Sequence, residues 1–522
     1  MRHPARLLLL ALTVGCTTPP ADDDDDSGTG SSGVASGTGA SSSAVGASSA
    51  AGSLSSSGSS GSGGSSGTST ASGGLPAHCT TPPVPATGPA ALDWVCVYGD
   101  GADQRFNTLR ADGAGGALWA GHGSGQFGVG GTSTTEVATA AIADIVWGRV
   151  EASGFGRWSR RPAEGGASPW PPDALGLTTV GALLYVAGAF EGTADLGQLP
   201  VTATGARDLF IASYLLDGAP QWSRTYHSEA GDRVIDGRAI AVDGTGAMYV
   251  GGSFRGRMDL GLGPLQRVGA NDDEAFLAKW SAAGTIQWNK RWGTGGAQVI
   301  HALAAHPLGG VSLTGVIENQ VDLTGTLMGA TNGAPTALVA RVAAGGSPTW
   351  ARALGTGAPG LHGAWAVAID GDGATWVGGA VDGTVDFGDG AGAAPASGFV
   401  ARYAEDGTLL CKRRFTGDGT PRVTALAVAG QNSVVAGGRV ESPAGAAATT
   451  VRAFVHRYDA ACAPVWERTW GAAGQRVGVD GVAVDATHLF VAGTLWSAGV
   501  TVDGAALGHA GGQDAWLARF TL

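Results

Sequence analysis

Four aspartates occupy the same place in a repeated pattern. Each follows a recurring glycine by seven residues, in the segments ADLG, MDLG, VDLT and VDFG, and they are Asp195, Asp259, Asp322 and Asp386. Carboxylates on a repeated loop could coordinate a cation or accept hydrogen bonds from sugar hydroxyls. An aspartate before glycine can instead accept hydrogen bonds from the amides of its own turn. We expect the turn role and keep the four as candidate binding residues.

Two further segments, Asp243-Gly-Thr-Gly and Asp370-Gly-Asp-Gly, resemble the start of a calcium-binding loop. Such a loop needs a glutamate at its twelfth position, which both segments lack, so we predict turns between two strands. The ten histidines contain no HExxH motif. We expect four of them to be polar residues of surface loops, namely His122, His227, His362 and His509. The sequence therefore predicts no metal site and no cofactor.

The first 16 residues, MRHPARLLLLALTVGC, have the features of an export signal. Two arginines precede an apolar stretch that is too short to span a membrane. The segment LTVGC at 12–16 resembles a bacterial lipobox, whose cysteine becomes lipidated and N-terminal. We expect residues 1–15 to be a lipoprotein signal peptide, Cys16 to carry the lipid and Thr17 to favour the outer membrane. An ordinary cleaved signal with an incidental cysteine is the alternative.

Residues 16–75 are predicted to be a disordered tether. After a run of five aspartates at 22–26 they are almost entirely Ser, Gly, Ala and Thr. Such a composition cannot bury enough apolar surface to offset the entropy lost on folding. We therefore expect a lipid-anchored stalk that carries a folded part at 76–522.

Four cysteines follow the stalk, Cys79, Cys96, Cys411 and Cys462, and none forms a CxxC redox motif. An even number in an exported protein indicates two disulfides, with three possible pairings. Cys79–Cys96 would pin the first strand of the folded part, and Cys411–Cys462 would then join neighbouring repeats. Free thiols are the alternative for the second pair.

The composition excludes several classes of protein. Glycine accounts for 91 of 522 residues, and it costs about 1 kcal/mol relative to alanine at a helical position. No Gly-x-y period is present, which excludes collagen. The formal net charge is −12, which argues against a nucleic-acid partner. A chain built mostly of strands and turns fits these numbers.

Three landmarks recur through the chain and define a repeat. The first is a tryptophan at intervals of 55 to 66 residues, with a cysteine in one place: Trp94, Trp158, Trp222, Trp288, Trp350, Cys411 and Trp466. The second is an apolar residue twelve positions before each of the last six: Val146, Phe210, Phe276, Leu338, Phe399 and Phe454. The third is a glycine that ends a short apolar run: Gly121, Gly188, Gly252, Gly315, Gly379, Gly437 and Gly493. Each unit thus holds a small-residue first strand, a glycine-containing second strand, a third strand and a tryptophan-containing fourth strand.

The two ends of the folded part complement each other. The chain stops at DAWLARFTL, a third strand without its fourth, and it begins with LDWVCVYG at 92–99, a fourth strand without its unit. We predict an all-β, seven-bladed β-propeller with four antiparallel strands per blade, closed by this N-terminal strand in the last blade. An open solenoid of similar hairpins is the alternative.

The segment WSRTYHSEAGDRVIDGRAIAVDGTGAMYVGGSF at 222–254 resembles the seven-bladed β-propeller repeat (SBBP-type) of many exported bacterial lipoproteins. The resemblance extends over about 430 residues, more loosely in the other copies. It implies the propeller fold and leaves the ligand open.

We expect a non-catalytic, surface-displayed binding module of an outer-membrane lipoprotein. The loops after the second strands, such as 191–207 and 255–272, are long and varied, which suits recognition. The predicted innermost strands carry almost no ionisable residues apart from Arg105 and Arg110. We expect a monomer that contacts the membrane through its lipid and binds an unidentified protein or polysaccharide. A periplasm-facing scaffold for envelope assembly and a polysaccharide-acting enzyme are the alternatives.

Overall fold

Strands account for the regular structure of the chain. The computed structural model describes residues 78–83, 89–124, 144–164, 175–228, 231–267, 272–355, 362–442 and 449–522. These residues form strands β1 to β38 and contain no α-helix, so the all-β prediction is confirmed for them. The chain divides into Met1–Ser69 and Thr70–Leu522. The predicted signal peptide, Cys16 and the predicted tether lie outside the described residues.

Most strands belong to four classes that recur in order along the chain. The first strands are β3 (Gln104–Ala111), β8 (Leu175–Val180), β14 (Gly231–Val242), β20 (Gln298–Ala305), β26 (Gly363–Ile369), β30 (Thr420–Val428) and β34 (Val477–Val484). The second strands are β4 (Ala117–Gly123), β9 (Leu183–Phe190), β15 (Met248–Arg255), β21 (Val311–Glu318), β27 (Thr375–Val385), β31 (Val434–Glu441) and β35 (His488–Leu495). The third strands are β5 (Asp144–Val150), β12 (Gly205–Leu215), β18 (Glu274–Trp280), β24 (Pro335–Val342), β28 (Gly392–Tyr403), β32 (Val451–Tyr458) and β38 (Asp514–Thr521). The fourth strands are β6 (Gly156–Arg160), β13 (Pro220–Tyr226), β19 (Ile286–Trp292), β25 (Pro348–Leu354), β29 (Leu409–Phe415), β33 (Pro464–Trp470) and β2 (Ala91–Tyr98).

Within a unit the strands pair antiparallel in the order first, second, third, fourth. Two neighbouring units are joined into one larger sheet, because β12 and β14 pair in parallel at Gly205 with Gly231 and at Arg207 with Val234. Short strands add to the edges of this pattern. They are β1 (Cys79–Thr80), β7 (Ala163–Glu164), β10 (Thr193–Ala194), β11 (Val201–Thr202), β16 (Arg257–Asp259), β17 (Pro264–Gln266), β22 (Val321–Asp322), β23 (Leu327–Met328), β36 (Thr501–Val502) and β37 (Ala505–Ala506).

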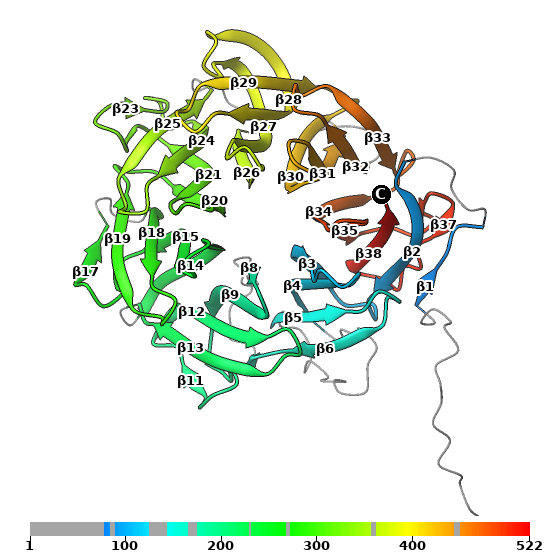
Figure 1. Ribbon diagram of the computed structural model, residues 1–522, viewed down its shortest axis with the longest axis horizontal. Helices are drawn as coiled ribbons and strands as arrows, with labels where there is room; N and C mark the ends of the chain where they lie inside the picture. The colour runs from blue at the N-terminus through cyan, green and yellow to red at the C-terminus, as the bar shows by residue number, and fades with distance from the viewer. Residues whose placement is uncertain are drawn as a thin grey trace, which may run out of the picture. The chain divides into compact units, whose positions relative to one another are not determined.

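The first strands line a common central cavity. Residues from all the first strands contribute to its wall. In Figure 1 these strands lie nearest the centre of the sheets, and fourth strands such as β13, β19 and β25 lie on the outside. One end of the cavity is walled mostly by apolar side chains, among them the alanines Ala111, Ala241, Ala304, Ala305, Ala368, Ala427 and Ala483. The small residues of the first strands therefore lie where the sequence placed them, at the narrow centre.

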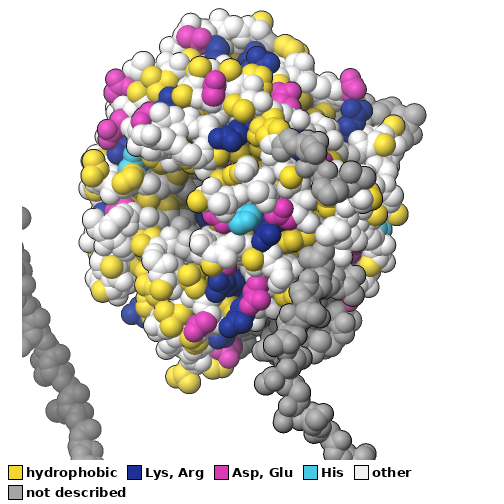
Figure 2. Space-filling model, turned by 45° about the vertical axis from the view of Figure 1, so that its right-hand side comes forward, with side chains coloured by type: hydrophobic (Ala, Val, Ile, Leu, Met, Phe, Trp, Pro, Cys, Tyr) yellow, Lys and Arg dark blue, Asp and Glu magenta, His cyan; other side chains and the backbone are white. Residues whose placement is uncertain are grey.

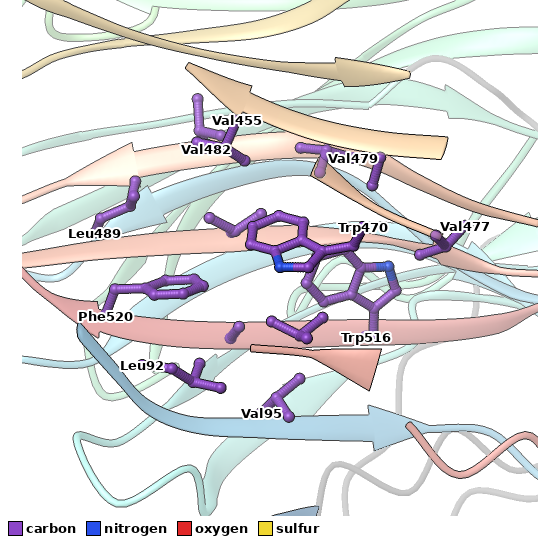
Figure 3. Close-up of a cluster of buried hydrophobic side chains, with 14 of the residues drawn as sticks. Leu92, Val95, Val455, Trp470, Val477, Val479, Val482, Leu489, Trp516 and Phe520 are labelled. Atoms are coloured by element: carbon purple, nitrogen blue, oxygen red, sulfur yellow. The ribbon is translucent and has the colours of Figure 1, made fainter. Parts of the chain in front are cut away.

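The N-terminal strand completes the sheet of the last unit. β2 pairs antiparallel with β38, from Ala91 with Thr521 to Tyr98 with Ala515, as the sequence predicted. Figure 3 shows Leu92 and Val95 of β2 beside Phe520 and Trp516 of β38 in one buried cluster. The two ends of the folded part are thus joined by packing as well as by backbone hydrogen bonds.

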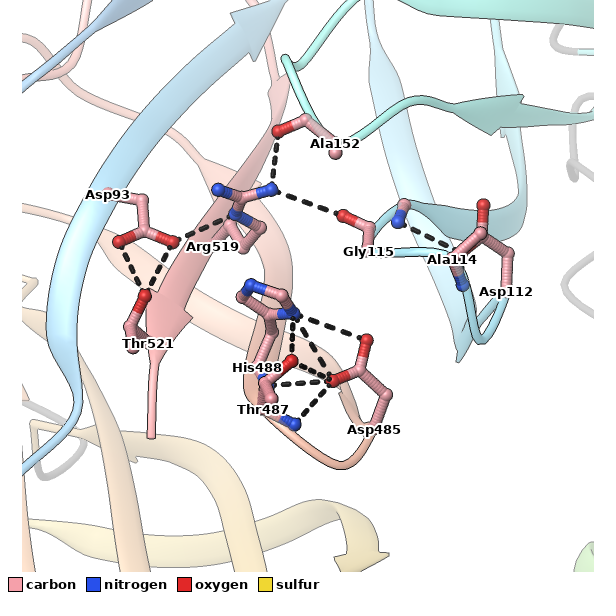
Figure 4. Close-up of polar contacts among 11 residues, drawn as sticks. Asp93, Asp112, Ala114, Gly115, Ala152, Asp485, Thr487, His488, Arg519 and Thr521 are labelled. Atoms are coloured by element: carbon pink, nitrogen blue, oxygen red, sulfur yellow. Dashed lines mark hydrogen bonds and ion pairs between the residues drawn. The ribbon is translucent and has the colours of Figure 1, made fainter.

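Arg519 of β38 connects this sheet to the next unit. Its Nε donates to Asp93 of β2 at 2.8 Å, and its Nη1 donates to the carbonyl oxygens of Ala152 at 2.6 Å and Gly115 at 3.3 Å (Figure 4). Thr521 also donates to Asp93. One guanidinium therefore holds both chain ends and the neighbouring sheet together.

Both predicted disulfides are present. Cys79 of β1 is bonded to Cys96 of β2, its partner across the strand pair. Cys411 of β29 is bonded to Cys462, which lies in the turn between β32 and β33. The second bond links neighbouring units, as expected from the sequence.

Four of the repeated tryptophans link their fourth strand to the turn of the next unit. Their Nε1 atoms donate to turn carbonyl oxygens in four pairs: Trp94 to Ala152 at 2.9 Å, Trp158 to Leu216 at 2.9 Å, Trp288 to Ala344 at 3.0 Å and Trp350 to Glu405 at 2.9 Å. Trp466 has no such partner for its buried Nε1. The sheet beside it ends in β38 and β2, which come from opposite ends of the chain, so that sheet has no turn to offer a carbonyl.

Candidate functional site

The four repeated aspartates lie at the outside of the sheets, each in its own turn. Three of them, Asp195, Asp259 and Asp322, belong to the short hairpins β10–β11, β16–β17 and β22–β23. The strands β11, β17 and β23 of these hairpins lie at the periphery in Figure 1. Each aspartate accepts a backbone amide of its turn: Asp195 from Gly197, Asp259 from Gly261, Asp322 from Gly325 and Asp386 from Gly388, at 2.6–2.8 Å. The amide of Gly388 is the main reason why the pKa of Asp386 lies below its usual value. These contacts are those that the turn interpretation predicted.

The two calcium-loop-like segments are also turns. Asp243 accepts hydrogen bonds from the amides of Thr245 and Ala247 and from the hydroxyl of Tyr249. Asp370 accepts from Trp376 Nε1 at 2.9 Å and from Arg402 Nε at 2.7 Å. Both carboxylates are buried and bonded within the fold, so they stabilise the turns between first and second strands.

The expectation of surface histidines is wrong for two of the four. His122 and His362 are buried, at 4% and 2% exposure, while His227 is exposed and contacts Asp208 at 2.6 Å. His122 belongs to the buried strand β4 rather than to a loop, and His362 directly precedes β26. His509 is half-buried, 3.9 Å from Asp514.

Within the described ranges, side chains of metal-ligating type gather at His78, Cys79 and Cys96. Both of those sulfurs belong to a disulfide, so no thiolate is available there.

A ring of extra residues projects into the central cavity. In most first strands of the described chain one residue is inserted opposite the second strand, as a β-bulge. At β14, for example, Gly237 pairs with Gly252 and Ala239 pairs with Gly251, which leaves Arg238 between them. The inserted residues are Asn107, Arg238, His301, Trp365, Thr424 and Asp480, and all of them line the cavity.

The bulges explain the repeated glycine of the second strands. A Cβ atom at Gly252 would lie 1.8 Å from the carbonyl oxygen of Asp236, and one at Gly315 would lie 2.0 Å from that of Val299. Only glycine leaves room for the bulged strand at this position. In β31 the equivalent residue is Gly438 rather than Gly437, because Gly438 pairs with Val423 before the bulge. The sequence assignment of Gly437 was therefore displaced by one residue.

One end of the cavity is rich in arginine, and we call it the arginine mouth. Its lining includes Arg105, Arg238, Trp365, Arg422, Arg439 and Asp480, around a space of about 350 Å³. Arg105 and Arg422 lie near the starts of first strands and Arg439 near the end of a second strand. The mouth therefore opens on the face from which the long loops to the third strands emerge.

The expectation that innermost strands carry almost no ionisable residues besides Arg105 and Arg110 is wrong. Arg238, His301, Arg422 and Asp480 also belong to first strands and line the cavity. A bulge breaks the alternation of inward and outward side chains, so residues just before the alanine-rich runs turn inward. An ionisable residue immediately before the run, as at Arg238, His301 and Asp480, was the signal in the sequence.

The arginines of the mouth differ in how far they are neutralised. Arg439 donates to Glu441 at 2.9 Å and to Asp480 at 3.1 Å, and Arg422 also contacts Glu441. Burial acts to raise the pKa of Glu441, but the two arginines hold that pKa below its usual value. Arg238 lies 3.5 Å from Asp236.

Arg105 differs from these three. It has no ion-pair partner among the described residues. Its buried Nε also has no hydrogen-bond partner, a feature that it shares with Arg238 and Arg422.

An aromatic group lies between a histidine and an arginine in the same space. The Trp365 ring is 6.4 Å from the His301 ring and 5.9 Å from Arg422 Cζ. Burial and then the charge of Arg238 lower the pKa of His301 to about 3, so its imidazole is neutral near pH 7. The mouth therefore combines guanidinium groups with an uncharged aromatic pair.

Over the face drawn in Figure 2, acidic and basic side chains are interspersed rather than gathered in one charged patch. No helix in the described ranges is both long and apolar enough to cross a membrane. No family model and no curated protein matches the chain, and the chemistry of the central cavity is the basis for assigning a function.

Proposed function

We propose that the chain is a bacterial outer-membrane lipoprotein in which residues 76–522 form a seven-bladed β-propeller of the SBBP-repeat kind. Three observations support the propeller. The four-stranded pattern recurs, the first strands share one cavity, and β2 completes the sheet of β38. The lipobox-like segment ending at Cys16 and the low-complexity composition that follows it support a lipid anchor on a stalk.

The propeller acts as a non-catalytic binding module at the cell surface. The observation that carries this proposal is the arginine mouth, where side chains converge in a cavity on the face with the long loops. Hydrolysis of a glycosidic bond uses a pair of carboxyl groups. In the described lining of the mouth the single carboxylate is Asp480, and it is already bonded to Arg439 and Thr494. That arrangement suits recognition better than acid–base chemistry.

Protease treatment of intact cells tests the location. Strands closed into sheets resist digestion, whereas the stretch at 27–74 is expected to be cut wherever protease reaches it. Release of a protected core smaller than the 51.6 kDa chain from intact cells would support surface display. A periplasmic protein that remains uncut is the control for leakage.

Cleavage only after the outer membrane is breached would contradict surface display. A periplasmic scaffold for envelope assembly would then be the better assignment.

A further inference from the structure

We propose that the arginine mouth binds a carboxylate-bearing sugar, such as a uronic acid unit of an acidic polysaccharide, and that Arg105 recognises the carboxylate. This inference rests on the proposed binding role of the propeller. It does not depend on which side of the membrane the propeller lies.

Arg105 is the cation of the mouth that is free to take a ligand. Arg422 and Arg439 share Glu441, and Arg439 also holds Asp480. Arg105 forms no ion pair with any described residue, although its Nε is buried. A guanidinium presents its N–H groups as a planar fork that matches the two oxygens of a carboxylate. A buried N–H without a partner is costly, so a ligand oxygen at this position would be favoured.

The neighbouring side chains favour a sugar as the carrier of that carboxylate. Trp365 is half-buried and presents an aromatic surface to the cavity, against which the apolar face of a sugar ring can pack. Asn107, Thr424 and Asp480 add an amide, a hydroxyl and a carboxylate to the same wall. Thr424 Oγ1 already donates to the carbonyl oxygen of Val479 at 2.6 Å, and Asp480 accepts from Arg439 and Thr494. The two side chains therefore offer acceptor oxygens to the hydroxyls of a sugar ring.

The size of the mouth agrees with a small ligand unit. Its volume of about 350 Å³ lies at the lower end of the range of about 300–1,000 Å³ for small-molecule sites. The part of the cavity between the bulge residues encloses about 120 Å³, and alanines of the first strands line the end beyond it. A sugar unit at the end or side of a polymer can therefore enter from the loop face, while the rest of the polymer stays outside.

Calorimetric titration of the purified full chain in detergent micelles tests the inference. The probes are tetragalacturonate, the neutral tetrasaccharide maltotetraose and the acidic peptide tetraglutamate. We expect tetragalacturonate to bind at low salt, with affinity that falls as salt is added, and the other two to bind at least tenfold more weakly. Arg105→Gln should weaken tetragalacturonate binding at least tenfold, and Arg105→Lys should weaken it less because the charge is kept.

Arg110→Gln is the matched control. Arg110 lies on the same strand but lines the other end of the cavity, where it donates to Leu109 O at 2.8 Å. Its substitution should change binding less than twofold. Equal binding of maltotetraose, tighter binding of tetraglutamate, no binding of tetragalacturonate, or an unchanged affinity in Arg105→Gln and Arg105→Lys would each overturn the inference.

The two tests fail separately. Protease access on cells reports where the propeller lies, and titration of purified protein reports what it binds. A negative titration beside a positive protease result would leave a surface module with a different ligand.

Discussion

Cys411 and Cys462 are bonded at the two positions where a neighbouring pair of units places a tryptophan and a glycine. In that neighbouring pair the tryptophan is Trp350 and the glycine is Gly407, and a Cβ atom at Gly407 would lie 2.7 Å from Trp350 Cγ. Gly407 and Cys462 occupy the same place in their turns, and Cys462 has a φ of 59°, a conformation that favours glycine. Cys411 in turn lies where the repeat has its tryptophan. A covalent bond thus replaces a packing contact that holds other units together.

Restoring the repeat at this junction should rescue a damaging substitution. Cys411→Trp alone removes the disulfide, worth about 2–4 kcal/mol, and forces an indole against the Cβ of Cys462. Adding Cys462→Gly makes room for the ring and relieves the left-handed backbone. We expect the double variant to be more stable than Cys411→Trp by about 0.5–3 kcal/mol, measured by urea unfolding without reductant.

The paired substitution of Cys411 and Cys462 by serine is the control for this cycle, because it removes the disulfide without adding bulk. It should lose about 2–4 kcal/mol. If Cys462→Gly lowered the stability of the tryptophan variant further, the proposed equivalence of the two contacts would be wrong.

Truncating Leu92 should weaken the junction between the chain ends. Leu92 is 4% exposed and belongs to the cluster of Phe520 and Trp516. Leu92→Ala should therefore lower the free energy of unfolding by about 2–5 kcal/mol and speed hydrogen exchange in β38. Val465→Ala on the fourth strand β33, where Val465 is 54% exposed, should change the unfolding free energy by about 0.5 kcal/mol or less. Similar losses in both variants would show that β2 does not depend on this packing.

His306 should make the fold sensitive to acid. It is buried, with Nε2 3.0 Å from Ser312 Oγ, and burial followed by the charge of Arg341 lowers its pKa from 6.5 to about 4. The unfolded chain then binds more protons between these values, so stability falls as pH drops from 6.5 to 4, by up to about 1.4 kcal/mol per pH unit. His306→Gln should flatten this part of the profile, as measured by urea unfolding at a series of pH values. Parallel profiles for the two proteins would contradict the prediction.

Cys16→Ser should release the protein from the membrane fraction. If Cys16 carries the lipid, its loss removes the anchor, and labelled fatty acid should no longer be incorporated. Thr17→Ser keeps the cysteine and is the control for expression and export. Continued labelling and membrane association of the serine variant at position 16 would place the anchor elsewhere.

The order of the strands could be predicted from the sequence because the landmark residues of the strands recur at regular spacings. The fixed twelve-residue offset, as between Phe210 and Trp222, predicted hairpins that the structure contains, and the unpaired strand around Trp94 predicted the pairing of β2 with β38. The disulfide pairs also followed from position. What spacing could not reveal was the bulge, because one inserted residue reverses which side chains face inward.

For the same reason the sequence missed most of the candidate site. Arg238 and His301 stand beside alanine-rich runs, and an unbroken alternation would have assigned them to the sheet interior or its edge. Only the paired registers show that each is an inserted residue facing the cavity. The repeated aspartates, which the sequence singled out, proved to be bonded within their own turns.

The bond between Cys79 and Cys96 also determines how the sheet of β2 and β38 would bear mechanical load. A pull transmitted along the chain from its N-terminal side reaches Cys79 first, and the disulfide carries the tension directly to Cys96, inside β2. The segment between the two cysteines, residues 80–95, is thereby bypassed. Force then acts on β2 where it is paired with β38 at Leu517. Many hydrogen bonds would have to yield together there, rather than opening one at a time from the strand's first residue.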